Sequence, residues 1–446
     1  MKRFLTLVAL AVLATVPALI LRATGWRPSP VIDAAVFGVA VLAAGFLLSW
    51  GAEAAEQHIS QGLILAAVAL VTVLPEYAVD LYYAYQAGRA GLESSYVHYA
   101  AANMTGANRL LVGLAWPLMV FLHWFKTRHR SIELAPANAI EIGFLLIASL
   151  YAFVILFKGR ITLLDFAILA AIFAAYVWRV RHLPKADNPD EEGEESGPAA
   201  ALNTLAPGAQ WAAMGALVIV ACAVILASAE PFAEAMVGTG RVIGLNEFLL
   251  IQWLAPLASE APAVSVAILF VLAGRAANGL VTMISDKINQ WTLLVGMLPL
   301  AMSIGAGSVS ALPLDARQSE EFFLTAAQSL FGLALLLRFR LGLTSALALA
   351  ALFLVQVGLA FAFRNDEARA IVTLTWLAWT YLGLTAIIVA VSGRQLMGVL
   401  ATAFSEPPIA TSSSCRRNID AFSIASSSRS PQAGLQDHGR APGAGP

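Results

Sequence analysis

The sequence predicts an all-α membrane protein with two inverted-topology five-helix repeats plus flanking helices, about twelve transmembrane helices in all. Three observations support this fold class. The composition is strongly apolar, the apolar residues are grouped into long segments, and motifs of the first half of the chain recur in the second half. The functional prediction comes from acidic residues that interrupt two of the apolar segments.

The composition identifies the chain as a membrane protein. Of its 446 residues, 59% are hydrophobic and 12% are charged, and the mean hydropathy is +0.75, outside the range of soluble domains. A formal net charge of −1 offers no basic surface, so nucleic-acid binding is excluded. Two cysteines supply neither a disulfide framework nor a thiolate metal cluster. We expect no cofactor and no protein partner; the expected partners are inorganic cations and the lipid bilayer.

Apolar segments long enough to span a bilayer, roughly 20 residues each, occur about twelve times. They begin near Phe4, Val31, Gln61, Tyr96, Asn138, Ile161, Gln210, Asn246, Lys287, Glu320, Gly342 and Arg369. The first segment is either a cleaved signal peptide or a transmembrane helix, and its length favours the helix. The distribution of Lys and Arg between the segments predicts cytoplasmic N and C termini in the cell (inner or plasma) membrane.

Two polar stretches divide the chain. The acidic stretch 183–208 is expected to be a solvated cytoplasmic linker, although a calcium-sensing role is an alternative. The predicted organisation is an N-terminal helix or signal peptide (1–30), a first repeat (31–182), the linker (183–208), a second repeat (209–363), an extra C-terminal helix (364–404) and a disordered tail (405–446) rich in Ser, Pro, Gly and Arg.

Four features of the first half recur in the same order roughly 180 residues later. The pairs are Ala52-Glu53 with Ala229-Glu230, Pro75-Glu76 with Ser259-Glu260, Leu110-Leu111-Val112-Gly113 with Leu293-Leu294-Val295-Gly296, and the basic turn at Lys158 with the one at Arg338. An odd number of helices in the duplicated unit makes the second copy enter the membrane from the opposite side. This arrangement is typical of transporters whose binding site lies near the membrane midplane.

The second helix of each repeat carries a glutamate next to a proline. Glu76 follows Pro75 directly, and Glu260 precedes Pro262 by two residues. Proline removes a backbone donor, so we expect it to break each helix and free carbonyl groups that join the carboxylate as cation ligands. The alternative is a packing kink with the glutamate snorkelling to an interface, which the cost of intramembrane acids disfavours.

The third helix of each repeat supplies a polar partner. Asn103 and Asp286 each lie seven residues before their copy of Leu-Leu-Val-Gly, so they occupy equivalent positions. For Asn103 the alternative role is an interhelical hydrogen bond. Asp80 lies four residues after Glu76, on the same helical face, and it is either a further ligand, a proton-relay group or neither.

Four other residues carry weaker expectations. Arg109 and Lys287 are expected to neutralise the acids when no cation is bound, although Lys287 can equally be a snorkelling residue at the membrane interface. His58 and His98 lie near predicted helix ends, where packing is expected. No Ser/His or paired-His arrangement has catalytic spacing, so an enzyme is not indicated.

At these residues the sequence resembles the cation/calcium antiporter superfamily, the sodium/calcium exchangers and their relatives, as a divergent prokaryotic-type member. That family carries Gly-Thr-Ser-x-Pro-Glu on the second helix of each repeat and an Asn-x-x-Gly-Ser-Asn-like pattern on the third. Here the corresponding segments of the first repeat are 71–76, Val-Thr-Val-Leu-Pro-Glu, and 103–108, Asn-Met-Thr-Gly-Ala-Asn. The resemblance covers residues 31–363.

The resemblance implies an ion-coordinating quartet. Its members are Glu76, Asn103, Glu260 and Asp286, with Asp80 as a further candidate ligand. The family's serine three residues before each glutamate is replaced by Val73 and Leu257. Such hydroxyls help to form sodium sites in exchangers, so their loss weakens sodium as the coupling ion more than it weakens a calcium site.

The resemblance also implies a secondary active transporter that exchanges Ca²⁺ or a similar cation for Na⁺ or H⁺ by alternating access. Carboxylates held together in a low dielectric repel one another, so they must bind protons or cations. Mutually exclusive occupancy then couples the two fluxes. The alternative is a non-transporting membrane scaffold or ion sensor that retains the exchanger fold, suggested by the missing serines and by Arg109.

Overall fold

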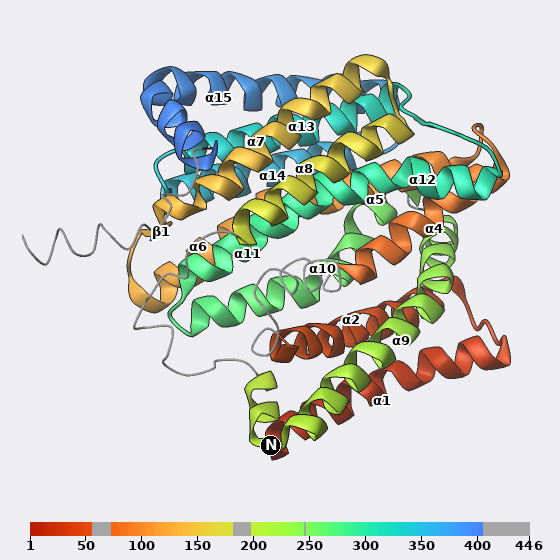
Figure 1. Ribbon diagram of the computed structural model, residues 1–446. Coiled ribbons are helices and arrows are strands. Elements are labelled where there is room, and N and C mark those ends of the chain that lie inside the picture. The colour runs from red at the N-terminus through yellow and green to blue at the C-terminus, as the bar shows by residue number, and fades with distance from the viewer. Residues whose placement is uncertain (56–72, 182–197, 245–246, 405–446) are drawn as a thin grey trace, which may run out of the picture. The chain divides into compact units, whose positions relative to one another are not determined.

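The structure is a computed structural model that describes residues 1–55, 73–181, 198–244 and 247–404 (Figure 1). Residues 1–404 belong to one compact unit. The described residues are almost entirely helical, and ten helical segments among them are long and apolar enough to cross a membrane. The predicted fold class, an all-α membrane protein, is therefore confirmed.

The helices follow the order that the sequence predicts. In the first half they are α1 (Lys2–Thr24), α2 (Pro30–Ala55), α4 (Leu74–Ala90), α5 (Ser95–Leu110), α6 (Trp116–Thr127), α7 (Ala139–Lys158) and α8 (Leu163–Arg181). In the second half they are α9 (Pro207–Ile243), α10 (Glu247–Leu272), α11 (Ala276–Asn289), α12 (Val295–Ala306), α13 (Ala316–Leu336), α14 (Leu343–Ala362) and α15 (Glu367–Phe404). Two short 3₁₀ helices, Pro136–Asn138 and Pro198–Thr204, lie in connections.

The predicted segment start near Gln61 lies outside the described residues, and one of the other predicted starts is wrong. The sequence places a start near Lys287, but α11 begins at Ala276 and Lys287 lies inside the helix. The polar residues around Asp286 resemble a helix boundary in the sequence. They are tolerated within a membrane helix because they are buried against other polar groups of the protein.

The third helix of each repeat contains a π-helical turn at the recurring Leu-Leu-Val-Gly motif. The turn η1 (Leu111–Ala115) joins α5 to α6, and η5 (Gln290–Leu294) joins α11 to α12. A π turn widens a helix and is often found at functional sites. Both turns follow the polar stretches that hold Asn103 and Asp286, so the repeats share a local distortion as well as a motif.

Two short antiparallel ribbons join the halves of the chain. Strand β1 (Ser131–Glu133) pairs with β4 (Arg340–Gly342), and β2 (Arg160–Ile161) pairs with β3 (Leu312–Pro313). In each ribbon one strand follows a third helix and the other follows a fourth helix from the opposite half. This exchange is the pattern expected of two repeats related by inversion.

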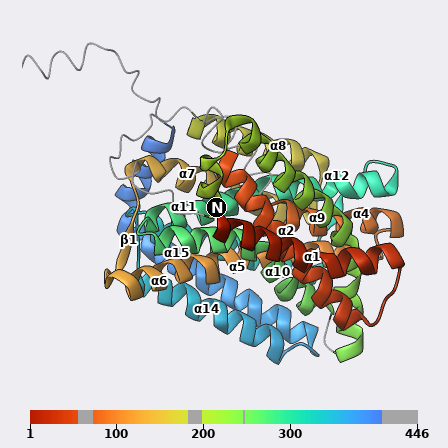
Figure 2. The same ribbon diagram turned by 90° about the horizontal axis from the view of Figure 1, so that it is seen from below.

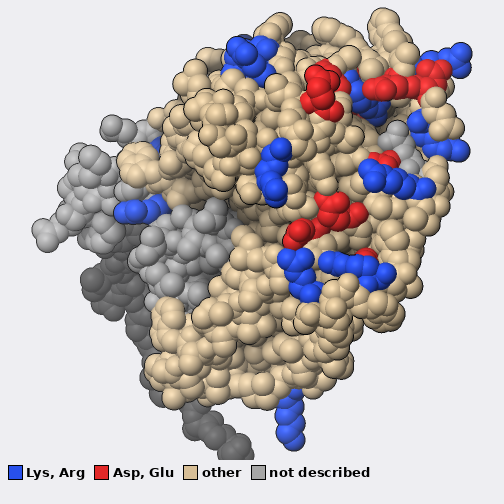
Figure 3. Space-filling view, turned by 90° about the vertical axis from the view of Figure 1, so that its right-hand side faces the viewer, with Lys and Arg blue, Asp and Glu red and all other residues tan. Residues whose placement is uncertain are grey.

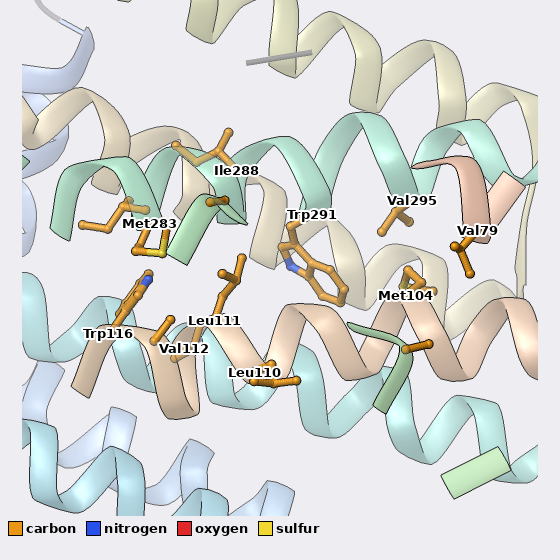
Figure 4. Packing of buried hydrophobic residues seen from close by; sticks show 14 of the residues in the cluster. Val79, Met104, Leu110, Leu111, Val112, Trp116, Met283, Ile288, Trp291 and Val295 are labelled. Carbon is orange, nitrogen blue, oxygen red and sulfur yellow. The ribbon is translucent and has the colours of Figure 1, made fainter. Parts of the chain in front are cut away.

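The first helices of the two repeats, α2 and α9, pack along each other (Figures 1 and 2). The third helices also meet, and Figure 4 shows Leu110 and Leu111 on one side of their contact with Ile288 and Trp291 on the other. These apolar side chains are buried. The four helices that carry the candidate acids and Asn103 are thereby held around one region of the core.

A glycine allows α5 and α10 to approach closely beside that region. A Cβ added at Gly106 of α5 meets the Gln252 carbonyl oxygen of α10 at 1.9 Å. Because the obstacle is backbone, Gly106→Ala must push the helices apart, and we expect it to cost about 1–3 kcal/mol of unfolding free energy. Thermal unfolding in detergent measures this against Gly383→Ala in α15, where nothing lies within 4 Å. Equal losses in the two variants would contradict the prediction.

Candidate ion-binding site

Glu76 lies at the beginning of a helix. Helix α4 begins at Leu74 with Pro75 in its first turn, where the missing N–H of proline has no helical partner to lose. Glu76 is in the same turn and its side chain is 1% exposed. The sequence Leu-Pro-Glu thus places a carboxylate inside the protein at a helix N-terminus.

Glu260 lies in the middle of α10, as predicted, but the helix is continuous there and not broken. The helix runs without interruption from Glu247 to Leu272 through both Pro256 and Pro262, so the expected break at this glutamate is wrong. Packing against neighbouring helices, including the close contact at Gly106, holds α10 together. Pro262 still lacks an N–H, so the carbonyl of Ala258 has no helical donor and remains available as a ligand.

The structure brings the predicted acids into one buried region. Glu76 interacts electrostatically with Glu260, Asp80 and Asp286. None of these four side chains is more than 7% exposed. Acidic and basic side chains also gather on the outer face seen in Figure 3, whereas these four acids are hidden from solvent.

Asn103 and Asp80 meet directly. The Asn103 Nδ2 atom donates a hydrogen bond of 2.9 Å to Asp80 Oδ1, and both side chains are fully buried. Among the described residues, the Asn103 Oδ1 atom then has no hydrogen-bond partner. The amide is therefore oriented with its oxygen available, and Asp80 belongs to the same cluster as the quartet.

The cluster contains buried oxygen atoms that receive no hydrogen bond from any residue that the structure describes. They are both carboxylate oxygens of Glu76, Oδ2 of Asp80, Oδ1 of Asn103 and Oδ2 of Asp286. Buried polar atoms normally have partners, because leaving them unpaired costs free energy. A proton or a cation would satisfy these atoms, and oxygen donors of this kind are what Ca²⁺ prefers.

One residue of the cluster was not predicted from the sequence. Gln290 Nε2 donates a hydrogen bond of 2.5 Å to Glu260 Oε1, and Gln290 Oε1 has no partner in the described part of the chain. Gln290 is the first residue of η5 and lies four residues after Asp286. The same spacing rule that selected Asp80 from Glu76 would have selected it.

The acids are near one another without converging on a single point. Within the described parts of the chain, no three His, Cys, Asp or Glu side chains are placed to hold one metal ion together. The quartet also uses an amide, which is not in that set of residue types. Simultaneous ligation by all its members therefore requires a change in their relative positions.

Lys287 is buried inside the protein, so the snorkelling alternative is wrong. Its Nζ atom donates to Asn108 Oδ1 at 2.7 Å and to the Asn108 carbonyl at 3.2 Å. It also lies 4.4 Å from the centre of the Trp291 ring. Lys287 interacts electrostatically with Glu76, but its direct partner is an amide.

Arg109 does not neutralise the candidate acids, which corrects the prediction. It forms an ion pair with Glu321 of α13 and stacks 5.2 Å from the Trp253 ring centre. Arg317 bonds the same glutamate at 2.5 Å and lies 3.7 Å from Glu320. These side chains form a separate buried ion network between the two halves.

The remaining sequence candidates lie at the margins of the structure. His98 lies near the start of α5, as expected, with its Nδ1 atom 2.5 Å from Gln318 Nε2 and 3.3 Å from Asp315. His58 and the side chain of Glu53 fall outside the described residues.

Comparisons with known proteins agree with this arrangement. A family model described as "Sodium/calcium exchanger protein" matches residues 29–180 and 214–362. The chain is similar to the crystal structure of the H⁺/Ca²⁺ exchanger CAX, with 38% sequence identity and a TM-score of 0.82. The alignment covers 90% of this chain and 98% of the CAX chain. No curated protein sequence matches the chain.

Two more distant structures share the fold. The Ca²⁺/H⁺ antiporter protein YfkE is 18% identical, with 82% of this chain and 100% of its own covered and a TM-score of 0.57. The sodium-calcium exchanger NCX_Mj is 15% identical, with coverage of 74% and 98% and a TM-score of 0.50. Together with the family match over both repeats, these findings identify the chain as a member of the sodium/calcium exchanger family, an integral membrane cation antiporter and not an enzyme.

Proposed function

We propose that this antiporter exchanges Ca²⁺ for protons. Glu76, Asn103, Glu260 and Asp286 provide the cation ligands, and Asp80 holds Asn103 in place and adds a further carboxylate. The observation that carries the proposal is the set of buried oxygen atoms without hydrogen-bond donors, contributed by both repeats. Such a set is costly unless a cation or protons occupy it.

The ligand chemistry favours Ca²⁺. This cation takes about six to eight oxygen ligands and accepts flexible geometry. The quartet offers three carboxylates and one amide oxygen, and the Ala258 carbonyl is available beside Glu260 because of Pro262. No thiol or imidazole belongs to the cluster in the described residues, so softer metals have no preferred donor there.

Two observations favour protons over sodium as the coupling ion. Val73 and Leu257 replace the serines that the sodium-coupled pattern carries, so hydroxyl ligands for Na⁺ are missing at these positions. The carboxyl groups of Glu76 and Glu260 are both buried and interact electrostatically, so a proton on either one relieves their repulsion. The similarity to the structure described as an H⁺/Ca²⁺ exchanger, at 38% identity, supports the same choice.

Exchange requires that the site open to one side of the membrane at a time. Helices α2 and α9 pack along each other and against the helices that carry the acids. Gly45 of α2 faces Pro262 of α10 and Pro75 of α4, so α2 crosses the site with no side chain at that point. Movement of this helix pair across the rest of the bundle would expose the acids alternately.

The orientation forms part of the proposal. The Lys and Arg distribution supports cytoplasmic N and C termini and insertion in the cell membrane. With that orientation, the connection between α6 and α7 and the connection between α13 and α14 lie in the cytoplasm. Both connections are rich in arginine, and they meet in the β1–β4 ribbon.

Flux through purified protein in sealed liposomes tests the coupling. We expect an imposed pH gradient to drive uptake of radioactive Ca²⁺, whereas an equal Na⁺ gradient at constant pH should drive none. Liposomes without protein measure the leak. Uptake that follows the Na⁺ gradient and ignores the pH gradient would contradict proton coupling.

One argument for the alternative function, a non-transporting scaffold or sensor, no longer holds. It was suggested partly by Arg109, whose charge would compete with a cation in the site. Arg109 instead pairs with Glu321. The flux assay also separates the two functions, because a sensor would bind Ca²⁺ without moving it.

A further inference from the structure

A cavity of about 590 Å³ lies beside the β1–β4 ribbon, away from the acid cluster. Three arginines line it: Arg130, which directly precedes β1, Arg338, which follows α13, and Arg340 of β4. None of the lining residues is acidic. The three guanidinium groups have no ion pair or hydrogen bond within the described part of the chain, and they lie at the mouth of one cavity.

The first repeat contains the same turn, with one of its two basic side chains in an ion pair. Lys158, Gly159 and Arg160 occupy the positions that Arg338, Phe339 and Arg340 occupy about 180 residues later, and both central residues have positive φ, 63° and 51°. In the first copy Lys158 forms an ion pair with Asp165.

In the second copy the position equivalent to Asp165 is Ser345, which lines the cavity. The position of the carboxylate that pairs with Lys158 in one repeat is therefore occupied by a serine in the other. The internal repeat thus provides its own reference: the fold tolerates an acid at this position, and the copy at the cavity has none.

The backbone holds the arginines in place. Phe339 adopts a left-handed conformation that non-glycine residues seldom take. Its carbonyl accepts a hydrogen bond of 2.7 Å from Leu134, and the carbonyl of Arg130 accepts one of 2.7 Å from Leu343. These bonds extend the β1–β4 ribbon on both sides, so the geometry that gathers the charges is fixed by pairing between the two repeats.

Beyond the arginines and a few hydroxyl side chains, one wall of the cavity is apolar and exposed. Leu347 of α14 is 53% exposed, and Ile387 and Val391 of α15 are 64% and 72% exposed. Helix α15 is kinked at the buried Ser392, which also lines the cavity. An apolar wall offers no favourable contact to a soluble anion, whereas an acyl chain can pack against it. The occupant must combine an anionic head with an apolar tail.

We propose that this cavity binds an anionic phospholipid. The phosphate lies among Arg130, Arg338 and Arg340, with the hydroxyl groups of Thr344 and Ser345 as further donors, and an acyl chain lies along the wall formed by α14 and α15. The charge complementarity is of the kind that basic pockets at the cytoplasmic ends of membrane helices show. The expected orientation places this end in the cytoplasm.

The test uses full-length protein in detergent with added phosphatidylglycerol, phosphatidylcholine or inorganic phosphate. We expect phosphatidylglycerol to raise the melting temperature of the protein and to stay bound in native mass spectrometry. Phosphatidylcholine and inorganic phosphate should have neither effect. Ser345→Asp installs the acid of the first repeat, and it should weaken phosphatidylglycerol binding about fivefold by neutralising one arginine. Ser345→Asn differs from Ser345→Asp in charge alone, and it should retain more phosphatidylglycerol than Ser345→Asp does.

A second variant keeps the test decisive if Ser345→Asp does not fold. The double variant Arg338→Gln/Arg340→Gln should weaken binding about 30-fold, and Arg364→Gln, at an exposed position outside the cavity, should not. Equal retention of phosphatidylglycerol by the double variant and the wild type would overturn the proposal. Equal stabilisation by inorganic phosphate alone would overturn the lipid assignment. Both readouts are independent of transport.

Discussion

Glu76→Gln and Glu260→Gln are each expected to reduce Ca²⁺ transport below about one hundredth of the wild-type rate, because the loss of a direct ligand should exceed the 10- to 100-fold effect of supporting residues. Glutamine has the same shape as glutamate. It carries no charge and takes up no proton, so it serves neither direction of the exchange. Each variant should also unfold at a higher temperature than the wild type, since it removes a buried charge that lacks sufficient partners.

The combination of lost transport and gained stability distinguishes a functional acid from a structural one. Radioactive Ca²⁺ uptake in liposomes and thermal unfolding in detergent provide the two measurements. Glu93→Gln is the matched control, because Glu93 is exposed in the connection between α4 and α5. Unchanged uptake by both site variants would show that these glutamates do not bind the transported ion.

Arg109→Met is expected to destabilise the protein by about 3–5 kcal/mol, the usual cost of leaving a buried charge without its partner. Glu321 would keep only Arg317, which Glu320 also approaches. The double variant Arg109→Met/Glu321→Met should recover most of this loss, because it removes both members of the pair. We therefore expect each charged side chain of the ion network to stabilise the protein only while its partner is present.

Unfolding in detergent gives this comparison directly. Arg364→Met serves as the control, since Arg364 is exposed and bonds only a nearby backbone carbonyl. We expect it to melt within a few degrees of the wild type. A double variant no more stable than Arg109→Met alone would mean that Arg109 acts through something other than its pairing with Glu321.

Local patterns allowed the fold and the acids to be predicted. A membrane helix can be recognised in the sequence from the length of its apolar segment. The repeats can be recognised because they share short motifs at a nearly constant offset. Glu76 and Glu260 are conspicuous because a charge within such a segment is costly. The meeting of these two acids follows from the inverted repeat, since equivalent helices must approach each other near its axis.

Partner choice could not be predicted in the same way. Glu321 lies in the fourth helix of the second repeat, and nothing in the sequence near Arg109 indicates that these two side chains meet. Lys287 was misplaced for a related reason, because its polar neighbours resemble a helix end. The continuity of α10 through two prolines also depends on helices packed around it, which tertiary structure alone reveals.

The most direct test of the central claim is calorimetric titration of the purified protein with Ca²⁺ in buffers of different ionisation enthalpy. If Ca²⁺ and protons compete for the carboxyl groups around Glu76 and Glu260, binding must release protons. The apparent binding enthalpy should then vary linearly with the buffer's ionisation enthalpy, and added Na⁺ should leave the affinity unchanged. Ca²⁺ binding with the same enthalpy in every buffer, weakened by Na⁺, would contradict this account.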